Sequence, residues 1–430
     1  MSRFVLQGAT HPDGTIQDVL IDDGVIRELA SGLSAEEVID CKGLRLLPGF
    51  VDMHTHLREP GFEASETVLT GTQSAALGGF TAVHAMANTS PVADNAAVVE
   101  MIRNLGDRAG YVEVFPIGAV TRGLEGKALA DFNLMNQSTA KVKVFSDDGK
   151  CVSDALLMRR ALEYTKSFGG VIAQHAQEPA LTENAQMNEG ELSAILGLKG
   201  WPAMAEETII ARDVLLAEHT GGRLHICHLS TAGSVEIIRW AKARGISVTA
   251  EVTPHHLLLT EQLAKDYNPI FKVNPPLRTE SDVMALREAL IDGTIDIIAT
   301  DHAPHPSESK DCEWAAAAFG MVGLETAASV AQLVLIESKR SSWERLAEVL
   351  SHAPAAIAGD EGQGQTIEVG NPANLTLINP SAIRTVSSAT ASKSLNNPYT
   401  GLELPGSVVH TIYRGRFTVR DSSLVEKTSA

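Results

Sequence analysis

The sequence predicts an α/β protein: a (β/α)8 barrel of the TIM type with a small β-sandwich domain formed from both chain ends. From residue 47 onwards, short apolar runs alternate with alanine-rich segments of helical pattern, and strands that alternate with helices form a parallel sheet. Before residue 47 and after about residue 362, short strand-like runs are separated by turn residues instead. The chain is therefore divided into residues 1–48 (sandwich), 49–361 (barrel) and 362–430 (sandwich).

Turn chemistry marks the expected strands at both ends. Pro-Asp-Gly at residues 12–14 and Asp-Asp-Gly at 22–24 separate strands expected at residues 4–6, 19–21 and 25–27. Four more are expected at residues 366–369, 375–378, 408–413 and 417–419. The Ser/Thr-rich run at residues 385–394 is interpreted as a mobile loop.

The central part supplies the runs expected in the parallel sheet. Strands are expected at residues 50–51, 81–83, 171–173, 224–226, 246–249 and 295–298, with helices at residues 71–77 and 155–164. This number of runs, with room for others, favours a closed barrel. Spacing alone leaves an open sheet as the alternative.

Composition limits the partners of this chain. The net charge is −18 over 430 residues and no basic stripe is present, which argues against nucleic-acid binding because phosphate contacts need Lys and Arg. No apolar stretch is long enough to span a bilayer, and the first residues do not resemble a signal segment. The four cysteines are scattered, as is typical of a reducing cytoplasm. We therefore expect a cytoplasmic protein with a small-molecule substrate.

The strongest local signal is the pair His54 and His56, which follows an apolar run. Alternate residues of a strand share one face about 6.6 Å apart, and imidazole is a usual zinc ligand. Arg58 falls on the same face, and Glu59-Pro60-Gly61 begins a loop. In a barrel the chemistry lies on loops that follow strands, so a ligand pair is favoured over two surface histidines placed by chance.

Further polar residues stand where apolar runs end. His175 and His228 follow two runs, and Asp148 and Asp301 follow two others. Taken singly, each has a structural alternative: a hydrogen-bonded core histidine, or an aspartate that caps a turn. His225, three residues before His228, is assigned to the opposite strand face, packing against helices. Together with the His54 pair they form a set too large for one tetrahedral zinc. The set suits two metal ions about 3.5–4 Å apart that share a water, and hence metal-assisted hydrolysis.

A series of motifs resembles the cyclic amidohydrolases, in particular the bacterial dihydroorotase family. The motifs occur in family order along the whole chain, and the β-rich ends resemble the composite sandwich domain of the family. They are PGFVDMHTHLREPG at residues 48–61, ANT at 87–89, FSDDG at 145–149, TPHH at 253–256, NPPLR at 274–278, TDHAPH at 300–305 and FGMVGLET at 319–326.

The resemblance implies site residues position by position. The implied metal ligands, for two zinc ions per subunit, are His54, His56, Asp148, His175, His228 and Asp301. The implied substrate contacts are His56, Arg58, Asn88, Asn274 and His305, with backbone groups of Phe319 and Gly320. Many relatives bridge their metals with a carbamylated lysine instead of an aspartate. Lys141 and Lys143 lie just upstream of Asp148 and leave that alternative open.

The implied reaction is the reversible cyclisation of N-carbamoyl-L-aspartate to (S)-dihydroorotate in pyrimidine (UMP) biosynthesis. In the hydrolytic direction a metal-bridging hydroxide attacks the ring amide, with Asp301 as general base and then acid, and Arg58 holds the substrate carboxylate bidentately. Two alternatives stay open: another cyclic amidase of the allantoinase or dihydropyrimidinase type, or an inactive scaffold for aspartate transcarbamoylase. A homodimer, or association of the active enzyme with that transcarbamoylase, is also compatible with the resemblance.

Overall fold

The centre of the molecule consists of parallel strands that come from successive parts of the chain. The structure, a computed structural model, describes residues 3–426. A three-stranded and a five-stranded parallel sheet have the orders β6-β7-β8 and β9-β10-β13-β14-β15. Their bounds are β6 (Phe50–Thr55), β7 (Phe80–Ala85), β8 (Glu113–Pro116), β9 (Val144–Phe145), β10 (Val171–Gln174), β13 (Arg223–Ile226), β14 (Val248–Val252) and β15 (Ile297–Ile298).

Two isolated bridges connect these sheets at both of their outer edges. Gly118, just after β8, pairs in parallel with Phe145 of β9. Thr55 of β6 pairs in parallel with His302, which follows β15. Each strand therefore has a parallel neighbour on both sides, and the carboxyl ends of all of them lie at one end of the arrangement.

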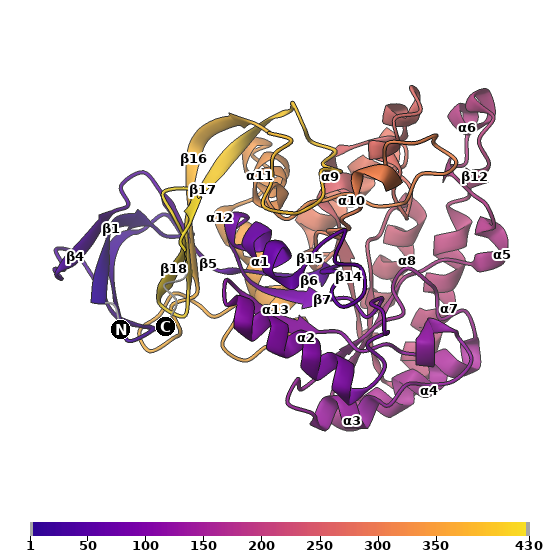
Figure 1. The fold of residues 1–430 in the computed structure, drawn as a ribbon, viewed down its shortest axis with the longest axis horizontal. Coiled ribbons are helices and arrows are strands. Elements are labelled where there is room, and N and C mark those ends of the chain that lie inside the picture. Colours follow the sequence, from indigo (N-terminus) through magenta and orange to yellow (C-terminus); the bar gives the residue numbers. More distant parts are fainter. Residues whose placement is uncertain (1–2, 427–430) are drawn as a thin grey trace.

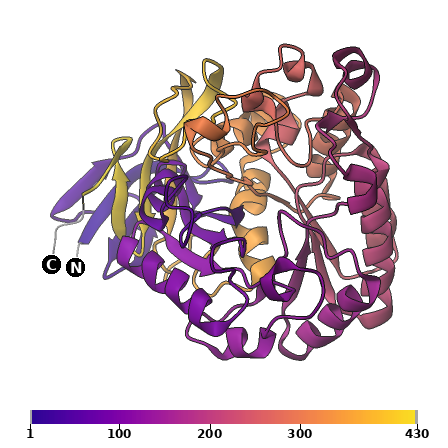
Figure 2. The same cartoon turned by 45° about the vertical axis from the view of Figure 1, so that its right-hand side comes forward.

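Helices alternate with the strands and lie along their outer side (Figures 1 and 2). Side-chain caps define several helix starts: Thr67 accepts from the backbone of Thr70 in α1, and Thr279 forms a capping box with Asp282 in α10. The helices are α1 (Val68–Leu77), α2 (Ala96–Ala109), α3 (Phe132–Gln137), α4 (Ala155–Thr165), α5 (Pro179–Thr182), α6 (Glu191–Leu196), α7 (Met204–Thr220), α8 (Ala232–Ala243), α9 (Pro254–Leu258), α10 (Glu280–Asp292), α11 (Ala327–Gln332), α12 (Trp343–Ala347) and α13 (Ala353–Ala358). A short parallel pair, β11 (Met187–Asn188) and β12 (Gly200–Trp201), flanks α6.

Both ends of the chain join in one nine-stranded sheet, which lies to the left of the helices in Figure 1. Strand β5, the last before the parallel strands, pairs antiparallel with β16, so the first and last parts of the chain meet there. The strands are β1 (Arg3–Thr10), β2 (Ile16–Asp22), β3 (Val25–Ala30), β4 (Glu37–Asp40), β5 (Arg45–Pro48), β16 (Leu375–Thr385), β17 (Glu403–Tyr413), β18 (Arg416–Arg420) and β19 (Ser423–Leu424). We call this unit the terminal sheet.

One expectation for the end of the chain is wrong, and another stays a prediction. Residues 366–369 form a bend and the start of a turn rather than a strand; the side chain of Asn371 donates to the carbonyl of Thr366. The mobility of the run at residues 385–394 stays a prediction, but the last part of this run is hydrogen-bonded to two carboxylates. Ser392 and the backbone of Lys393 donate to Glu66, and the backbone of Ala391 donates to Glu325.

The apolar core has two main parts around the parallel strands. The larger part lies between strands and helices and includes Leu224, Ile226, Ile209 and Val214. A smaller cluster, which includes Met53 and Cys227, lies on the inner side of the strands and is closed by Ile357 and Ala358 at the end of α13. The α/β class with a parallel sheet is confirmed. Within residues 3–426, the helices are all too short or too polar to cross a membrane.

Candidate metal centre

The structure brings all six predicted ligands together at the carboxyl ends of the parallel strands. His54 lies in β6 with His56 just beyond it, His175 follows β10 directly, and His228 follows β13. Asp148 and Asp301 lie just beyond β9 and β15. All six are buried.

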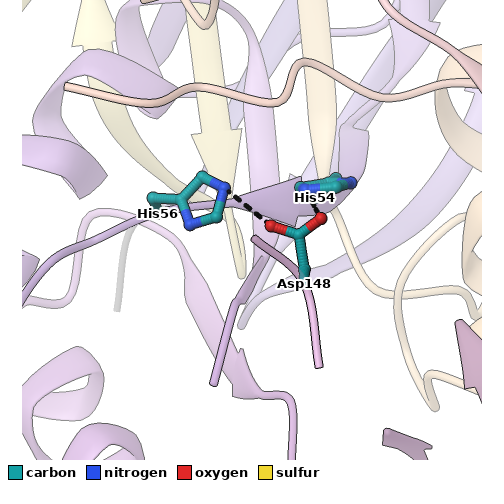
Figure 3. A group of neighbouring side chains, drawn as sticks. All are labelled: His54, His56 and Asp148. Carbon is teal, nitrogen blue, oxygen red and sulfur yellow. Dashed lines mark ion pairs between the residues drawn. The ribbon is translucent and has the colours of Figure 1, made fainter. Parts of the chain in front are cut away.

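Asp148 lies at the centre of the four histidines. Its Oδ1 is 3.2 Å from His175 Nδ1, 3.2 Å from His228 Nε2 and 3.4 Å from His54 Nε2. Its Oδ2 is 3.2 Å from His56 Nε2, and Figure 3 shows the carboxylate between His54 and His56. Burial alone would raise the pKa of Asp148, but the histidines outweigh this effect and hold the pKa well below its ordinary value.

Asp301 also contacts the His54 and His56 pair. Its Oδ1 is 3.1 Å from His56 Nε2 and 3.4 Å from His54 Nε2. Burial would raise the pKa of Asp301, but His54 and His56 overcome burial and lower the pKa to about 2. Asp301 therefore carries a full negative charge at neutral pH.

Two of the predicted ligands occupy an unusual backbone conformation. His228 has φ 33° and Asp301 has φ 46°, in the left-handed region that residues other than glycine seldom adopt. Such a conformation costs about 1–3 kcal/mol and is found most often where function requires it. Here it turns each side chain toward the centre after the strand has ended.

Outer hydrogen bonds orient three of the imidazoles. His54 Nδ1 donates to Glu251 Oε1 (2.6 Å), His56 Nδ1 to Asn88 Oδ1 (2.9 Å) and His175 Nε2 to Gln177 Oε1 (2.8 Å). Each ring therefore presents its other nitrogen to the carboxylates of Asp148 and Asp301. Burial would lower the pKa values of His54, His56 and His175, but these carboxylates overcome burial and raise them. The arrangement therefore favours a positive charge, a proton or a metal ion, between the ring nitrogens and the carboxylates.

This donor set fits metal ions. Two groups of donors each lie within 4.8 Å of one another: His54 with His56 and Asp148, and Asp148 with His175 and His228. Asp148 belongs to both groups. His54 Nε2 is buried and forms no hydrogen bond within the described residues, as expected of a nitrogen placed for a metal ion.

Both upstream lysines point elsewhere. Lys143 Nζ donates to the carbonyl of Gly359 (2.6 Å). Lys141 and Lys143 line a separate cavity of about 330 Å³ together with His84 and Asp360, which also form an ion pair. The structure therefore supports Asp148 rather than a modified lysine between the two groups.

The predicted substrate contacts surround the centre on neighbouring loops. Arg58 Nε donates to the carbonyl of Pro304, and its Nη2 is 3.4 Å from His305 Nε2. His305 in turn lies 2.8 Å from the carbonyl of Phe319. At Gly320, which has φ 147°, a Cβ would approach His305 Nε2 to 2.8 Å, so only glycine fits there.

Asn88 and Asn274 complete this set. Asn88 contacts both His56 and the backbone of Asp148. Asn274 donates to Gln177, and its buried Oδ1 has no hydrogen-bond partner among residues 3–426. All of the predicted substrate contacts thus lie near the metal groups or next to residues that touch them.

One sequence interpretation is wrong and one important residue was missed. His225 does not pack against the helices: its Nε2 lies 3.1 Å from Glu251 Oε2, on the inner side of β13 and β14. Glu251 also holds His54 and the backbone of His228. An acidic residue inside an apolar strand run was the signal in the sequence that could have identified Glu251.

Histidine and aspartate donors that converge at the carboxyl ends of parallel strands define the class of metal-assisted hydrolases. Comparisons with known proteins agree. A family model described as dihydro-orotase-like matches residues 43–234. A dihydroorotase of Streptomyces coelicolor is 63% identical over 99% of this chain and 100% of its own length. A dihydroorotase of Mycobacterium tuberculosis is 52% identical, with the same coverage of both chains. The chain therefore belongs to the dihydroorotase family and is an enzyme, a cyclic amide hydrolase.

Solved structures share the fold. An L-hydantoinase (dihydropyrimidinase) from Arthrobacter aurescens has a TM-score of 0.88 at 24% identity and covers 99% of this chain and 98% of its own. A dihydropyrimidinase from Brevibacillus agri has a TM-score of 0.84 at 22% identity, covering 99% of this chain and 96% of its own. At this level of identity the likeness concerns the arrangement of the chain.

Proposed function

We propose that this enzyme interconverts N-carbamoyl-L-aspartate and (S)-dihydroorotate in pyrimidine biosynthesis. The observation that carries the proposal beyond the relatives is Arg58, whose guanidinium is held by the carbonyl of Pro304 and lies beside His305. Within residues 3–426, Arg58 forms no ion pair with a carboxylate, although burial lowers its pKa only to about 10 and leaves it charged. A substrate carboxylate supplies the missing partner.

We propose two zinc ions, held by the six residues predicted from the sequence. His54, His56 and Asp148 form one group, and Asp148, His175 and His228 the other; Asp301 lies against the first group. When bound, such ions ionise a water near neutral pH and polarise a carbonyl.

Side chains of this protein bind the ring and transfer the proton of the attacking water. Arg58 holds the carboxylate with its planar fork, and Asn88, Asn274, His305 and the backbone of Phe319 and Gly320 fix the ring. Asp301, ionised at neutral pH, takes the proton of the attacking water and delivers it to the departing ring nitrogen. In the direction of synthesis the same carboxylate moves the proton back.

A direct comparison of substrates tests the proposal. Purified protein would be assayed with dihydroorotate, allantoin and dihydrouracil, while its zinc content is measured. We expect turnover of dihydroorotate alone and about two zinc ions per chain. Turnover of only the two uncharged rings would favour the other cyclic amidases, and a metal-free inactive protein would favour a scaffold.

One variant tests whether zinc binding and turnover depend on the same residue. His54→Ala removes a donor that belongs to a candidate metal group and contacts both aspartates, so we expect loss of zinc and of turnover. Exposed His219→Ala is the matched control and should retain both.

Several broader assignments remain part of this proposal. We interpret the parallel strands as a closed (β/α)8 barrel and the terminal sheet as a sandwich-like domain, with boundaries at residues 1–48, 49–361 and 362–430. The bridges that join the two parallel sheets support the barrel, and the pairing of β5 with β16 supports the boundaries. A cytoplasmic location agrees with four free cysteines. A homodimer and association with aspartate transcarbamoylase stay predictions from the resemblance.

A further inference from the structure

Two buried lysines lie beside the substrate-binding loops but outside the metal centre. Lys272 and Lys310 expose only 2% and 4% of their surface. Within residues 3–426 neither ammonium group forms an ion pair with a carboxylate, and burial lowers the pKa of both. Burying ammonium groups without an opposite charge is costly, so this arrangement calls for an explanation.

The two side chains bind each other's segment. Lys310 Nζ donates to the carbonyls of Pro269 and Lys272, at 2.9 Å each. Lys272 Nζ donates in the opposite direction, to the carbonyls of Trp314 (2.7 Å) and Ala315 (3.2 Å). Segment 269–272 and the 306–318 loop are therefore joined reciprocally, by two hydrogen bonds from each side. We call this arrangement the lysine clasp.

The clasp lies between the groups proposed to bind substrate. Asn274 follows Lys272 by two residues, whereas His305 precedes the 306–318 loop and Phe319 and Gly320 follow it. The ammonium of Lys272 also lies 4.4 Å from the centroid of the Phe319 ring, and its backbone carbonyl accepts from Gly320 N (3.0 Å). The distance between Asn274 and the Phe319–Gly320 backbone is thus set through Lys272.

We propose that Lys272 and Lys310 are positioning residues for substrate binding: the lysine clasp holds Asn274 and the Phe319–Gly320 backbone at a fixed distance from each other around the ring. This proposal rests on the proposed function, because it assigns the clasp to substrate binding by that site. Within residues 3–426 the hydrogen bonds of both ammonium groups go to backbone carbonyls and not to a predicted metal ligand. The clasp also works in both protonation states, since a neutral amine keeps the two N–H groups that its two carbonyl partners require.

The test uses Lys310→Met and Lys272→Met in the zinc-loaded full chain. Methionine keeps an unbranched apolar side chain of similar length but donates no hydrogen bond. The matched control is Lys265→Met, since Lys265 is exposed in the same part of the chain. Hydrogen–deuterium exchange of peptides covering 306–318, zinc content, and kcat and KM for dihydroorotate would be measured on each.

We expect faster exchange of the 306–318 loop in both clasp variants. We also expect a KM raised about tenfold, the order expected when a misplaced loop loses one hydrogen bond to the substrate. Zinc content and kcat should stay within about twofold, and Lys265→Met should match the wild type. Unchanged exchange would overturn the clasp. Faster exchange with unchanged KM, or a fall in kcat and zinc content together, would overturn the positioning role.

The proposed function can fail independently of the clasp. If the wild type does not turn over dihydroorotate, the function is wrong, whereas exchange of the 306–318 loop still reports whether the clasp exists. If Lys272→Met does not fold, Lys310→Met tests the clasp by itself. It removes the two hydrogen bonds donated from the 306–318 loop, and its loop exchange and KM supply the same two readouts.

Discussion

In the proposed function, Arg58 selects the ring that the site accepts. Its Nε is fixed on the carbonyl of Pro304, which orients the guanidinium beside His305. His305 stays neutral at physiological pH, because burial and the charge of Arg58 lower its pKa to about 3. In the proposed function the guanidinium therefore supplies the positive charge that selects a carboxylate over an uncharged ring edge.

Arg58→Ala should consequently lower kcat/KM for dihydroorotate by roughly ten- to over a hundredfold, the loss expected for a charge-assisted contact. Zinc content should be unchanged, because Arg58 contacts none of the donor atoms. Steady-state kinetics and metal analysis check this. Equal kinetics of variant and wild type would rule out the carboxylate contact.

Glu251 orients His54, one of the proposed metal ligands. Its carboxylate accepts from His54 Nδ1 at 2.6 Å and from His225 Nε2 at 3.1 Å, and burial would otherwise raise its pKa, which these histidines lower strongly. Such partners fix the tautomer of a ligand and raise its basicity.

Glu251→Gln should weaken zinc binding by about 10–100-fold while the fold is retained, since glutamine keeps the size of the side chain. Zinc titration against a competing chelator would measure the change. Exposed Asp266→Asn provides the charge-matched control. Wild-type affinity in Glu251→Gln would show that His54 needs no such partner.

At the scale of strands, the sequence predicts which residues end a strand better than which way they face. The alternation rule places His225 and His228 on opposite faces. In the structure both lie on the inner side, because His228 lies beyond β13 and its left-handed backbone turns the side chain back. A rule based on period two cannot anticipate that turn.

The pair Asp147 and Asp148 shows the same limit. Asp147 accepts from the backbones of Val120 and Thr121 and from the Thr121 hydroxyl, a long-range structural role that differs from the local turn cap considered for an aspartate in this position. Asp148 is left to face the histidines. The motif alone does not separate these roles, because the distinction depends on donors that lie more than twenty residues away.

Buried Lys310 of the lysine clasp should make the free energy of unfolding depend on pH. An unfolded lysine has a pKa of about 10.4, whereas burial, followed by the charge of Lys272, lowers the pKa of folded Lys310 to about 7. Between about pH 7 and pH 10 the unfolded chain holds a proton that the folded chain has released. The contribution of Lys310 to the free energy of unfolding therefore rises with pH through this window.

In Lys310→Met this contribution is absent. The difference in Tm, wild type minus variant, should increase from about pH 6.5 to about pH 9, and calorimetric or fluorescence scans would measure it. Lys265→Met should run parallel to the wild type. A difference that is constant or falls with pH would show that Lys310 keeps its ordinary pKa in the folded protein.

For the whole molecule, the sequence predicts the parallel core and the return of the chain end to its beginning, but not how the terminal segment reaches the site. Strands 375–378, 408–413 and 417–419 follow from alternating apolar residues and lie within β16, β17 and β18. The segment that follows β16 is rich in Ser and Thr, and composition predicts mobility there. Its partners Glu66 and Glu325 are distant in sequence, and local composition carries no information about them.

Asn396 lies two residues beyond that segment and connects the terminal part of the chain to the proposed substrate-binding loops. Its buried Nδ2 donates to the carbonyls of Ala303 (2.9 Å) and Gly320 (3.1 Å), and its Oδ1 accepts from the backbone of His305 (3.2 Å). One side chain thus binds the beginning and the end of the segment that carries His305 and Gly320.

Asn396→Ala leaves three backbone groups without this partner, and each buried group left unpaired costs about 1–3 kcal/mol. We expect a lower Tm and a KM for dihydroorotate raised about tenfold, with zinc content unchanged because Asn396 lies outside the donor set. Ser388→Ala, exposed in the same segment, should leave Tm and KM unchanged. A loss of Tm without a change in KM would mean that Asn396 stabilises the chain but does not position the loop, which would confine the terminal segment to a structural role.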